Sequence, residues 1–287
     1  MNELHIPGTI YKPQCPAAGH YWLNAGLCEY NGQTVMAYRV DRFPCSVVLS
    51  EVDDRYQPQN ARWLFELGQP GITPVVPEDP RLFVHDDRLA IVYAGVERPW
   101  STIWYAEYDA QYEMRHKEQA TYGGRLEKNW TPFTRDNDLF FVYNHDPFTV
   151  IQRRGDGQWR LKYCQDVVWG WDWGEMRGGT PAIWHDGLYY HFFHSSGCVG
   201  LTKVYFVGVY TFDRDFRPVS ITRLPIMSGH GDHYTQPWGG GPISAVFPCG
   251  AVFRDDKWAI SYGYLDSEVR VVEFDHDTIE KTLVKIG

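Results

Sequence analysis

The chain alternates between short apolar runs and polar turns, and one such arrangement recurs five times. Each copy has a turn rich in Asp, Asn or Gly, followed by a mostly apolar run that ends on an aromatic residue. A polar turn between two apolar runs is typical of a β-hairpin. The closing aromatics recur roughly every 50 residues, except for a last interval of about 70. They are Tyr38, Tyr93, Tyr143, Phe192 and Tyr262.

This repeat predicts the fold class. No long segment has the 3.6-residue period of a helix, and the best helical candidate is residues 277–284. An all-β chain with a period near 50 is typical of a propeller. A β-sandwich would account for the short strands but not for the recurring hairpin. We therefore expect an all-β, five-bladed β-propeller with a central active-site funnel. Residues 1–287 would form a single domain, with blades near 20–60, 75–115, 125–165, 177–215 and 240–275.

The long last interval contains a loop insertion near residues 223–241. A long loop within a compact domain is often a binding element. His230, Asp232 and His233 are of metal-ligand type, but a Gly-rich loop is more often a plain loop, and we predict no metal there. No cofactor is expected elsewhere in the chain.

Composition and charge narrow the class of partner. Apolar residues make up 44% of the chain and aromatics 16%, which excludes a disordered protein. A net charge of −9 disfavours nucleic acid and anionic membranes as partners. The six cysteines form no C-x-x-C pair, and neither a leader peptide nor a membrane-spanning run is recognisable. These features predict a cytoplasmic protein, with its oligomeric state left open.

Polar residues flank the repeated hairpins. The inner strands of a propeller converge on one axis, so side chains at the same end of each strand should meet. A mixture of carboxylates, amides, cations and aromatic rings suits a hydroxyl-rich ligand such as a sugar. Taken singly, Asp79 could be only a turn cap, and Lys128 and Arg177 only solvated charges. The full set is Asn24, Arg39, Glu78, Asp79, Arg81, Lys128, Asn129, His145, Asp146, Arg177, His194, Tyr264 and Asp266.

The run Glu78-Asp79-Pro80-Arg81 resembles the acidic motif of glycoside hydrolase family 130. Members of this family are five-bladed propellers that phosphorolyse or hydrolyse β-mannosides, and the mannosyltransferases of glycosyltransferase family 108 are their relatives. The resemblance covers roughly residues 20–275 and extends to four further segments in the expected order. These segments are Asn24 with Arg39, Lys128-Asn129, Tyr190 to Ser195 with His194, and Phe247 to Asp266.

The resemblance implies roles for the acids. Asp79 would be the proton donor, acting through a sugar hydroxyl, and Asp266 would hold the sugar in the −1 subsite. A general acid working near neutral pH needs a raised pKa, which Glu78 would favour and Arg81 would oppose. A hydrolase also needs a second carboxylate to activate water. Asp146 and Asp266 are the main candidates for that base, and Asp172 and Glu175 in a Trp-rich loop are others.

Two segments depart from the family pattern. Phosphorolytic members carry an arginine for phosphate after the third hairpin, where this chain has Asn144-His145-Asp146. The run Arg177 to Pro181 resembles instead a branch that includes transferases. An aspartate is a poor neighbour for a phosphate dianion, although Arg125, Lys128 and Arg177 could compensate.

We predict a carbohydrate-active enzyme that acts on β-mannoside-type linkages, with Asp79, Asp146 and Asp266 as its catalytic residues. It would be a glycosidase, a phosphorylase or a glycosyltransferase. Its substrate would be an oligosaccharide or glycoside, with inorganic phosphate as a second substrate for a phosphorylase. The alternatives are a glycan-binding propeller without turnover and an unrelated arabinanase-like hydrolase.

Overall fold

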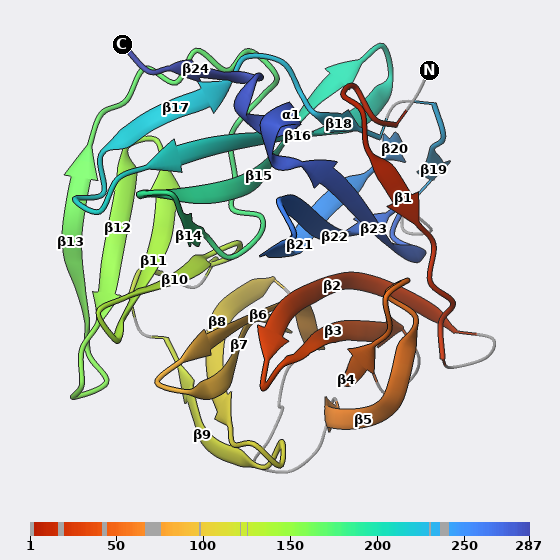
Figure 1. Cartoon of the computed structure of the whole chain (residues 1–287), viewed down its shortest axis with the longest axis vertical. Helices are drawn as coiled ribbons and strands as arrows, with labels where there is room; N and C mark the ends of the chain where they lie inside the picture. Colours follow the sequence, from red (N-terminus) through yellow and green to blue (C-terminus); the bar gives the residue numbers. More distant parts are fainter. Residues whose placement is uncertain are drawn as a thin grey trace.

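The computed structural model describes most of the chain, and its strands form five sheets arranged around a central axis (Figure 1). The described residues are 3–16, 20–41, 45–66, 76–97, 99–120, 122–124, 126–229, 231–235 and 241–287.

Each of the first three sheets is a meander of four antiparallel strands in chain order, as the repeated hairpins predict. The first contains β2 (Tyr21–Tyr30), β3 (Gln33–Asp41), β4 (Ser46–Val52) and β5 (Pro58–Glu66). The second contains β6 (Val76–His85), β7 (Arg88–Glu97), β8 (Trp100–Tyr108) and β9 (Met114–Gln119). The third contains β10 (Thr131–Arg135), β11 (Asp138–His145), β12 (Phe148–Arg153) and β13 (Trp159–Gln165).

The fourth sheet is larger than the others and has eight strands. Its main path is β14 (Ile183–His185), β15 (Leu188–Val199), β16 (Thr202–Phe212), β17 (Pro218–Thr222) and β24 (Leu283–Lys285). The loop insertion adds β18 (Met227–Ser228), β19 (Tyr234–Thr235) and β20 (Pro242–Ser244). His230 of this insertion lies outside the described residues.

The last sheet joins the two ends of the chain. It contains β21 (Val246–Arg254), β22 (Lys257–Tyr264) and β23 (Glu268–Asp275), and β1 (Thr9–Tyr11) pairs with β23 at its outer edge. Figure 1 shows β1 lying beside β23. An N-terminal strand paired with the last sheet closes the ring without a covalent bond.

The all-β propeller is confirmed, but the prediction of a five-bladed propeller is corrected: the described residues form four regular four-stranded blades and one larger, eight-stranded sheet. The extra strands come from the insertion and from the C-terminus. The predicted helix over 277–284 is also too long. The helix α1 is His276–Glu280, and the following residues form β24, which pairs with β17.

The core fills the contacts between neighbouring sheets. Five buried apolar clusters each join two adjacent sheets, including the first sheet with the last. Because aromatic side chains bury a large apolar area, the repeated closing aromatics are well suited to these contacts. Tyr38, Tyr93, Phe192 and Tyr262 are buried as expected, whereas Tyr143 is only half-buried.

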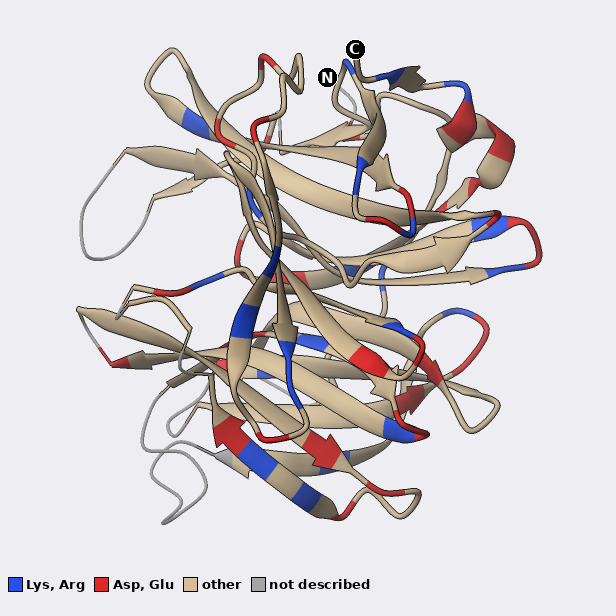
Figure 2. Ribbon diagram, turned by 90° about the vertical axis from the view of Figure 1, so that its left-hand side faces the viewer, with Lys and Arg blue, Asp and Glu red and all other residues tan. Residues whose placement is uncertain are grey.

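Positions of Lys and Arg and of Asp and Glu are interspersed along the ribbon (Figure 2). Among the described residues, no helix is long and apolar enough to cross a bilayer.

Candidate active site

Two neighbouring inner strands bulge near their starts and bring Asn24 and Asp79 together. The register of β2 shifts between Leu23 and Gly26, and that of β6 shifts between Glu78 and Arg81. Asn24 has φ 46° and Asp79 has φ 55°, in the left-handed region that Asn and Asp tolerate better than most residues. Asn24 Nδ2 donates to Asp79 Oδ1 at 2.7 Å, and Asp79 is only 9% exposed. Irregular backbone therefore fixes the central acid.

A third inner region approaches from the last sheet. A Cβ atom on Gly263 would lie 1.9 Å from Asn24 Oδ1, so only glycine allows this approach. Because Gly263 has no side chain, β22 can lie directly against the Asn24 side chain.

Glu78 carries an ion-pair network drawn from three sheets. Its Oε1 lies 3.2 Å from Arg39 Nη1, and its Oε2 lies 2.9 Å from Lys128 Nζ. Arg39 Nη2 also lies 3.1 Å from Asp41 Oδ1. Burial lowers the pKa of both cations, but the nearby carboxylates, chiefly Glu78, outweigh it and raise both pKa values. Arg39 and Lys128 are therefore held charged, with Glu78 between them.

Arg81 is buried beneath this network, with 1% exposure. Its Nε donates to the carbonyl of Gly179 at 2.6 Å, and its Nη1 donates to the carbonyl of Asp79 at 3.0 Å. Its Nη2 donates to Asn129 Oδ1 at 3.2 Å. These contacts join β6 to the segments that precede β10 and β14, so Arg81 fixes the backbone around the site.

A buried histidine, His191, supports the backbone around Arg81. His191 Nε2 accepts the backbone N–H of Gly179 at 3.1 Å, which requires the ring proton of neutral His191 to sit on Nδ1. That nitrogen lies 2.7 Å from the Tyr210 hydroxyl, which in turn lies 3.2 Å from His145 Nε2. This hydrogen-bond network reaches from Gly179, which Arg81 contacts, to His145 in the third sheet. No local pattern in the sequence could reveal it.

His145 and His194 are both buried, with 4% and 3% exposure. Burial lowers the pKa of His145 to about 3 and that of His194 well below its usual value, so both rings are neutral near pH 7. The His194 backbone pairs with Arg177, and its Nδ1 is buried without a hydrogen-bond partner. The guanidinium of Arg177 instead points outward, where it pairs with Glu175 at 2.8 Å.

The last sheet contributes Tyr264 and Asp266. Leu265 and Asp266 form a left-handed turn, with φ values of 51° and 47°. Asp266 is an exposed residue, but desolvation of its carboxyl, together with the negative charges of Asp79 and Glu78, raises its pKa, while a hydrogen bond from Tyr234 and the charge of Arg39 act against the rise. Asp266 therefore lies near enough to Asp79, Glu78 and Arg39 for their charges to act on its carboxyl.

Asp146 lies apart from this group. It occupies the exposed turn between β11 and β12, and its carbonyl accepts a hydrogen bond from the Asn144 side chain at 2.7 Å. Together with the Trp-rich loop it lines a groove of about 580 Å³ that also includes Asp172 and Glu175. In the described part of the chain, no hydrogen bond or ion pair links Asp146 to Asp79.

Metal-ligand residue types gather at one place among the described residues. His185, Asp186 and His276 offer ligand atoms within 4.8 Å of one another. However, the indole N–H of Trp258 donates to His276 Nδ1 at 3.0 Å, which places the proton of the neutral ring on Nε2. Neither nitrogen of His276 is then open to a metal, so this cluster is a poor metal site.

Comparison with known proteins places the chain in a family. A profile of glycoside hydrolase family 130, described as beta-1,4-mannooligosaccharide phosphorylase, matches residues 24–285. No curated protein sequence matches the chain.

Three similar solved structures share the fold at low sequence identity. A glycosyl hydrolase from Bacteroides ovatus has 16% identity and a TM-score of 0.68, with 100% of this chain and 94% of that chain covered. A β-1,2-mannobiose phosphorylase from Listeria innocua, in complex with β-1,2-mannobiose, has 14% identity and a TM-score of 0.68, with 96% and 99% covered. A mannose phosphorylase from Leishmania mexicana, in complex with phosphate, has 15% identity and a TM-score of 0.66, with 99% and 94% covered.

The family match confirms the prediction of a carbohydrate-active enzyme that acts on β-mannosidic linkages. Because the matched profile spans nearly the whole ring of sheets and includes Asn24, Glu78 and Asp79, the chain belongs to glycoside hydrolase family 130.

Proposed function

We propose that this protein hydrolyses β-mannosidic linkages, with Asp79 as proton donor and the ring of sheets acting as one catalytic domain. The supporting observation is the placement of Asp79. It is a buried carboxyl on a left-handed bulge at the axis, fixed by Asn24 and bordered by the Glu78 ion-pair network.

The hydrogen bond from Asn24 supports the role of Asp79 as an acid. Asn24 holds Oδ1 of Asp79, and the second oxygen, Oδ2, lies outside that hydrogen bond. A positioned carboxyl can then pass its proton from Oδ2 to a sugar hydroxyl, which gives its own proton to the glycosidic oxygen as the glycosidic bond breaks. Arg39 and Lys128 both pair with Glu78, so the negative charge of Glu78 is neutralised.

Asp266 is the better candidate for the second carboxylate. A general base works best when its pKa lies near the working pH, and the pKa of Asp266 is raised by its surroundings. Asp146 is the other candidate, and it faces the groove beside the axis. Inversion at the sugar would require about 6.5–9.5 Å between the two carboxyl groups, which leaves room for a water molecule.

The pairing of the cations in the site supports water, rather than phosphate, as the acceptor of the mannosyl group. Among the described residues, Arg39 and Lys128 pair with Glu78, Arg177 pairs with Glu175, and Arg81 is buried against backbone carbonyls. A phosphate dianion would have to compete with these carboxylates and approach Asp79 and Asp266. Arg125, which could have helped to bind phosphate, lies outside the described residues.

Phosphorolysis is the second candidate, and the family description favours it. The side chains of Lys128 and Arg177 are 43% and 52% exposed, so either could turn toward an incoming anion. Such pairs are weak at an exposed site, where they contribute about 0–1 kcal/mol.

A product assay separates these functions. The purified chain is incubated with β-1,4- and β-1,2-linked mannobiose in phosphate-free buffer, and again with inorganic phosphate. We expect free mannose in both buffers. Turnover that requires phosphate and yields a mannosyl phosphate would instead establish a phosphorylase. Turnover only with an activated mannosyl donor would establish a glycosyltransferase, and binding without turnover would establish a glycan-binding protein.

A further inference from the structure

The insertion in the eight-stranded sheet reaches across to the last sheet and touches the site. Tyr234 in β19 donates its hydroxyl hydrogen bond to Asp266 Oδ2. Two residues earlier, Asp232 Oδ2 accepts a hydrogen bond from the Tyr264 hydroxyl at 2.6 Å. Two separate contacts therefore join the insertion to the two residues of the last sheet that the sequence had placed in the site.

The insertion is held on its own sheet as well. β19 pairs with β20, and β20 pairs in parallel with β16, so Tyr234 is presented from a hydrogen-bonded strand. The Ser244 hydroxyl also donates to the carbonyl of Asp232. A side chain anchored in this way can orient a partner across a sheet boundary at a low cost in conformational entropy.

We propose that Tyr234 is a positioning residue, whose hydroxyl hydrogen bond orients the Asp266 carboxylate in the site. This inference rests on the proposed function, because it takes Asp266 as a carboxylate that serves the sugar or the attacking water. It also gives a reason for the unusual size of the eight-stranded sheet, whose added strands deliver Tyr234 to a neighbouring sheet.

The direction of the electrostatic effect follows from the groups that face Asp266. Desolvation and the charges of Asp79 and Glu78 favour the protonated carboxyl, whereas Tyr234 and Arg39 favour the ionised form. Removing the Tyr234 hydroxyl removes a group that favours ionisation. The pKa of Asp266 then rises further, and the acid limb of the activity profile moves to higher pH.

The test compares Tyr234→Phe with Tyr163→Phe. Among the described residues, the Tyr163 hydroxyl bonds only to Gln165 on the outer strand β13, so its removal is a matched control. We expect Tyr234→Phe to lower kcat/KM about tenfold near neutral pH, as for loss of one hydrogen bond to a charged group. The acid limb should also move upward, while Tyr163→Phe leaves both unchanged. A loss of activity without movement of the acid limb would show a structural role only and would overturn the inference.

A binding measurement keeps this outcome separate from the proposed function. Mannose binding is measured by calorimetry across the acid pH range for Asp79→Asn and for Asp79→Asn combined with Tyr234→Phe. We expect binding by the double variant to weaken at a higher pH than binding by the single variant. Identical pH dependence would overturn the role of Tyr234 even if Asp79 proves essential. Full turnover by Asp79→Asn alone would overturn the proposed function instead.

Discussion

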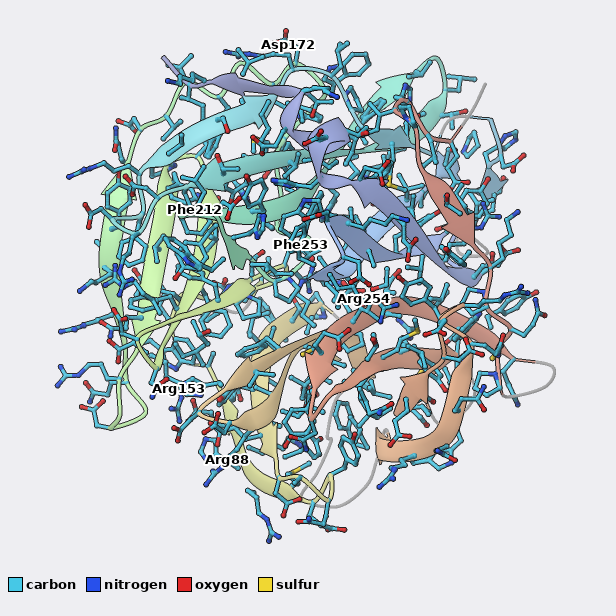
Figure 3. All side chains as sticks on the ribbon, in the orientation of Figure 1. Arg88, Arg153, Asp172, Phe212, Phe253 and Arg254 are labelled. Carbon is cyan, nitrogen blue, oxygen red and sulfur yellow. The ribbon has the colours of Figure 1, made fainter. Side chains whose placement is uncertain are left out.

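The two ends of the inner strands differ sharply, although the same strands form both. At the starts of β2 and β6, left-handed residues break the ladder and present Asn24 and Asp79. At the other ends the ladder is regular, and the strands surround an apolar opening of about 300 Å³. Figure 3 places Phe253 near the centre of the ring, whereas Arg88 and Arg153 lie toward the periphery. The residues that line the apolar opening include Leu27, Leu82, Phe83, Phe133, Ala251 and Phe253.

This contrast shows how one strand can serve two purposes. Regular pairing with apolar side chains stabilises the ring at one end. Bulges and positive φ values cost stability at the other end but point polar groups at a common centre. We therefore expect substitutions at the apolar end to change stability and those at the bulged end to change activity.

The largest effect should come from Phe133→Ala at the apolar end. Phe133 is 2% exposed, and the centroid of its ring lies 5.0 Å from that of Tyr189 and 5.2 Å from that of Phe212. Its removal leaves a cavity that should lower the free energy of unfolding by about 3–5 kcal/mol, measured by urea denaturation. In the folded variant at low temperature, kcat/KM should stay near that of the wild type. A severe loss of activity in the folded state would break the comparison.

The next effect should come from Asp79→Asn at the bulged end. The asparagine keeps an oxygen for the Asn24 hydrogen bond and tolerates the left-handed φ, so the fold should not change. Loss of a positioned acid should lower kcat at least about 100-fold, or roughly 2.7 kcal/mol. Steady-state kinetics and thermal unfolding test both statements. Asp86→Asn is the control, because Asp86 also has positive φ but lies in the turn at the far end of the same strand.

The smallest effect should come from Asn24, where two substitutions separate backbone from side chain. Asn24→Gly suits φ 46° but removes the amide donor to Asp79, so kcat/KM should fall about tenfold with little change in stability. Asn24→Ala should show the same kinetic loss and also lose about 1–2 kcal/mol in unfolding free energy, because alanine resists positive φ. Asn31→Gly, at φ 52° in the hairpin turn at the opposite end of β2, should leave kinetics unchanged. Equal activity of Asn24→Gly and wild type would show that the amide does not orient the acid.

Much of the fold could be predicted because hairpins are local. Polar turns and alternating apolar runs specify β2–β3 and β6–β7 within about twenty residues of chain. The short strands β1 and β24 were missed because each has three residues and completes a sheet built from distant sequence. Their formation depends on an exposed edge that only the folded ring provides.

The site was predictable in part for the same reason. Residues at the starts of inner strands could be named, and Asn24, Glu78 and Asp79 do meet at the axis with Arg39 and Lys128. The sequence could not show which of the predicted residues would contact this group. The Asp146 carbonyl instead accepts a hydrogen bond from Asn144, and Arg177 pairs with Glu175. Nor could it show that Arg81 would be buried against backbone carbonyls.

By itself, the sequence determined the strands, their turns and the positions where polar groups interrupt them, because backbone preference and side-chain alternation act between near neighbours. Only the tertiary structure decided which carboxylate pairs with which cation, and that His191 supports Gly179 and Tyr234 reaches Asp266. Other contacts in the site join residues much farther apart in the chain, such as Arg81 and Gly179. Such contacts form when the sheets close around a common axis, and no local preference encodes them.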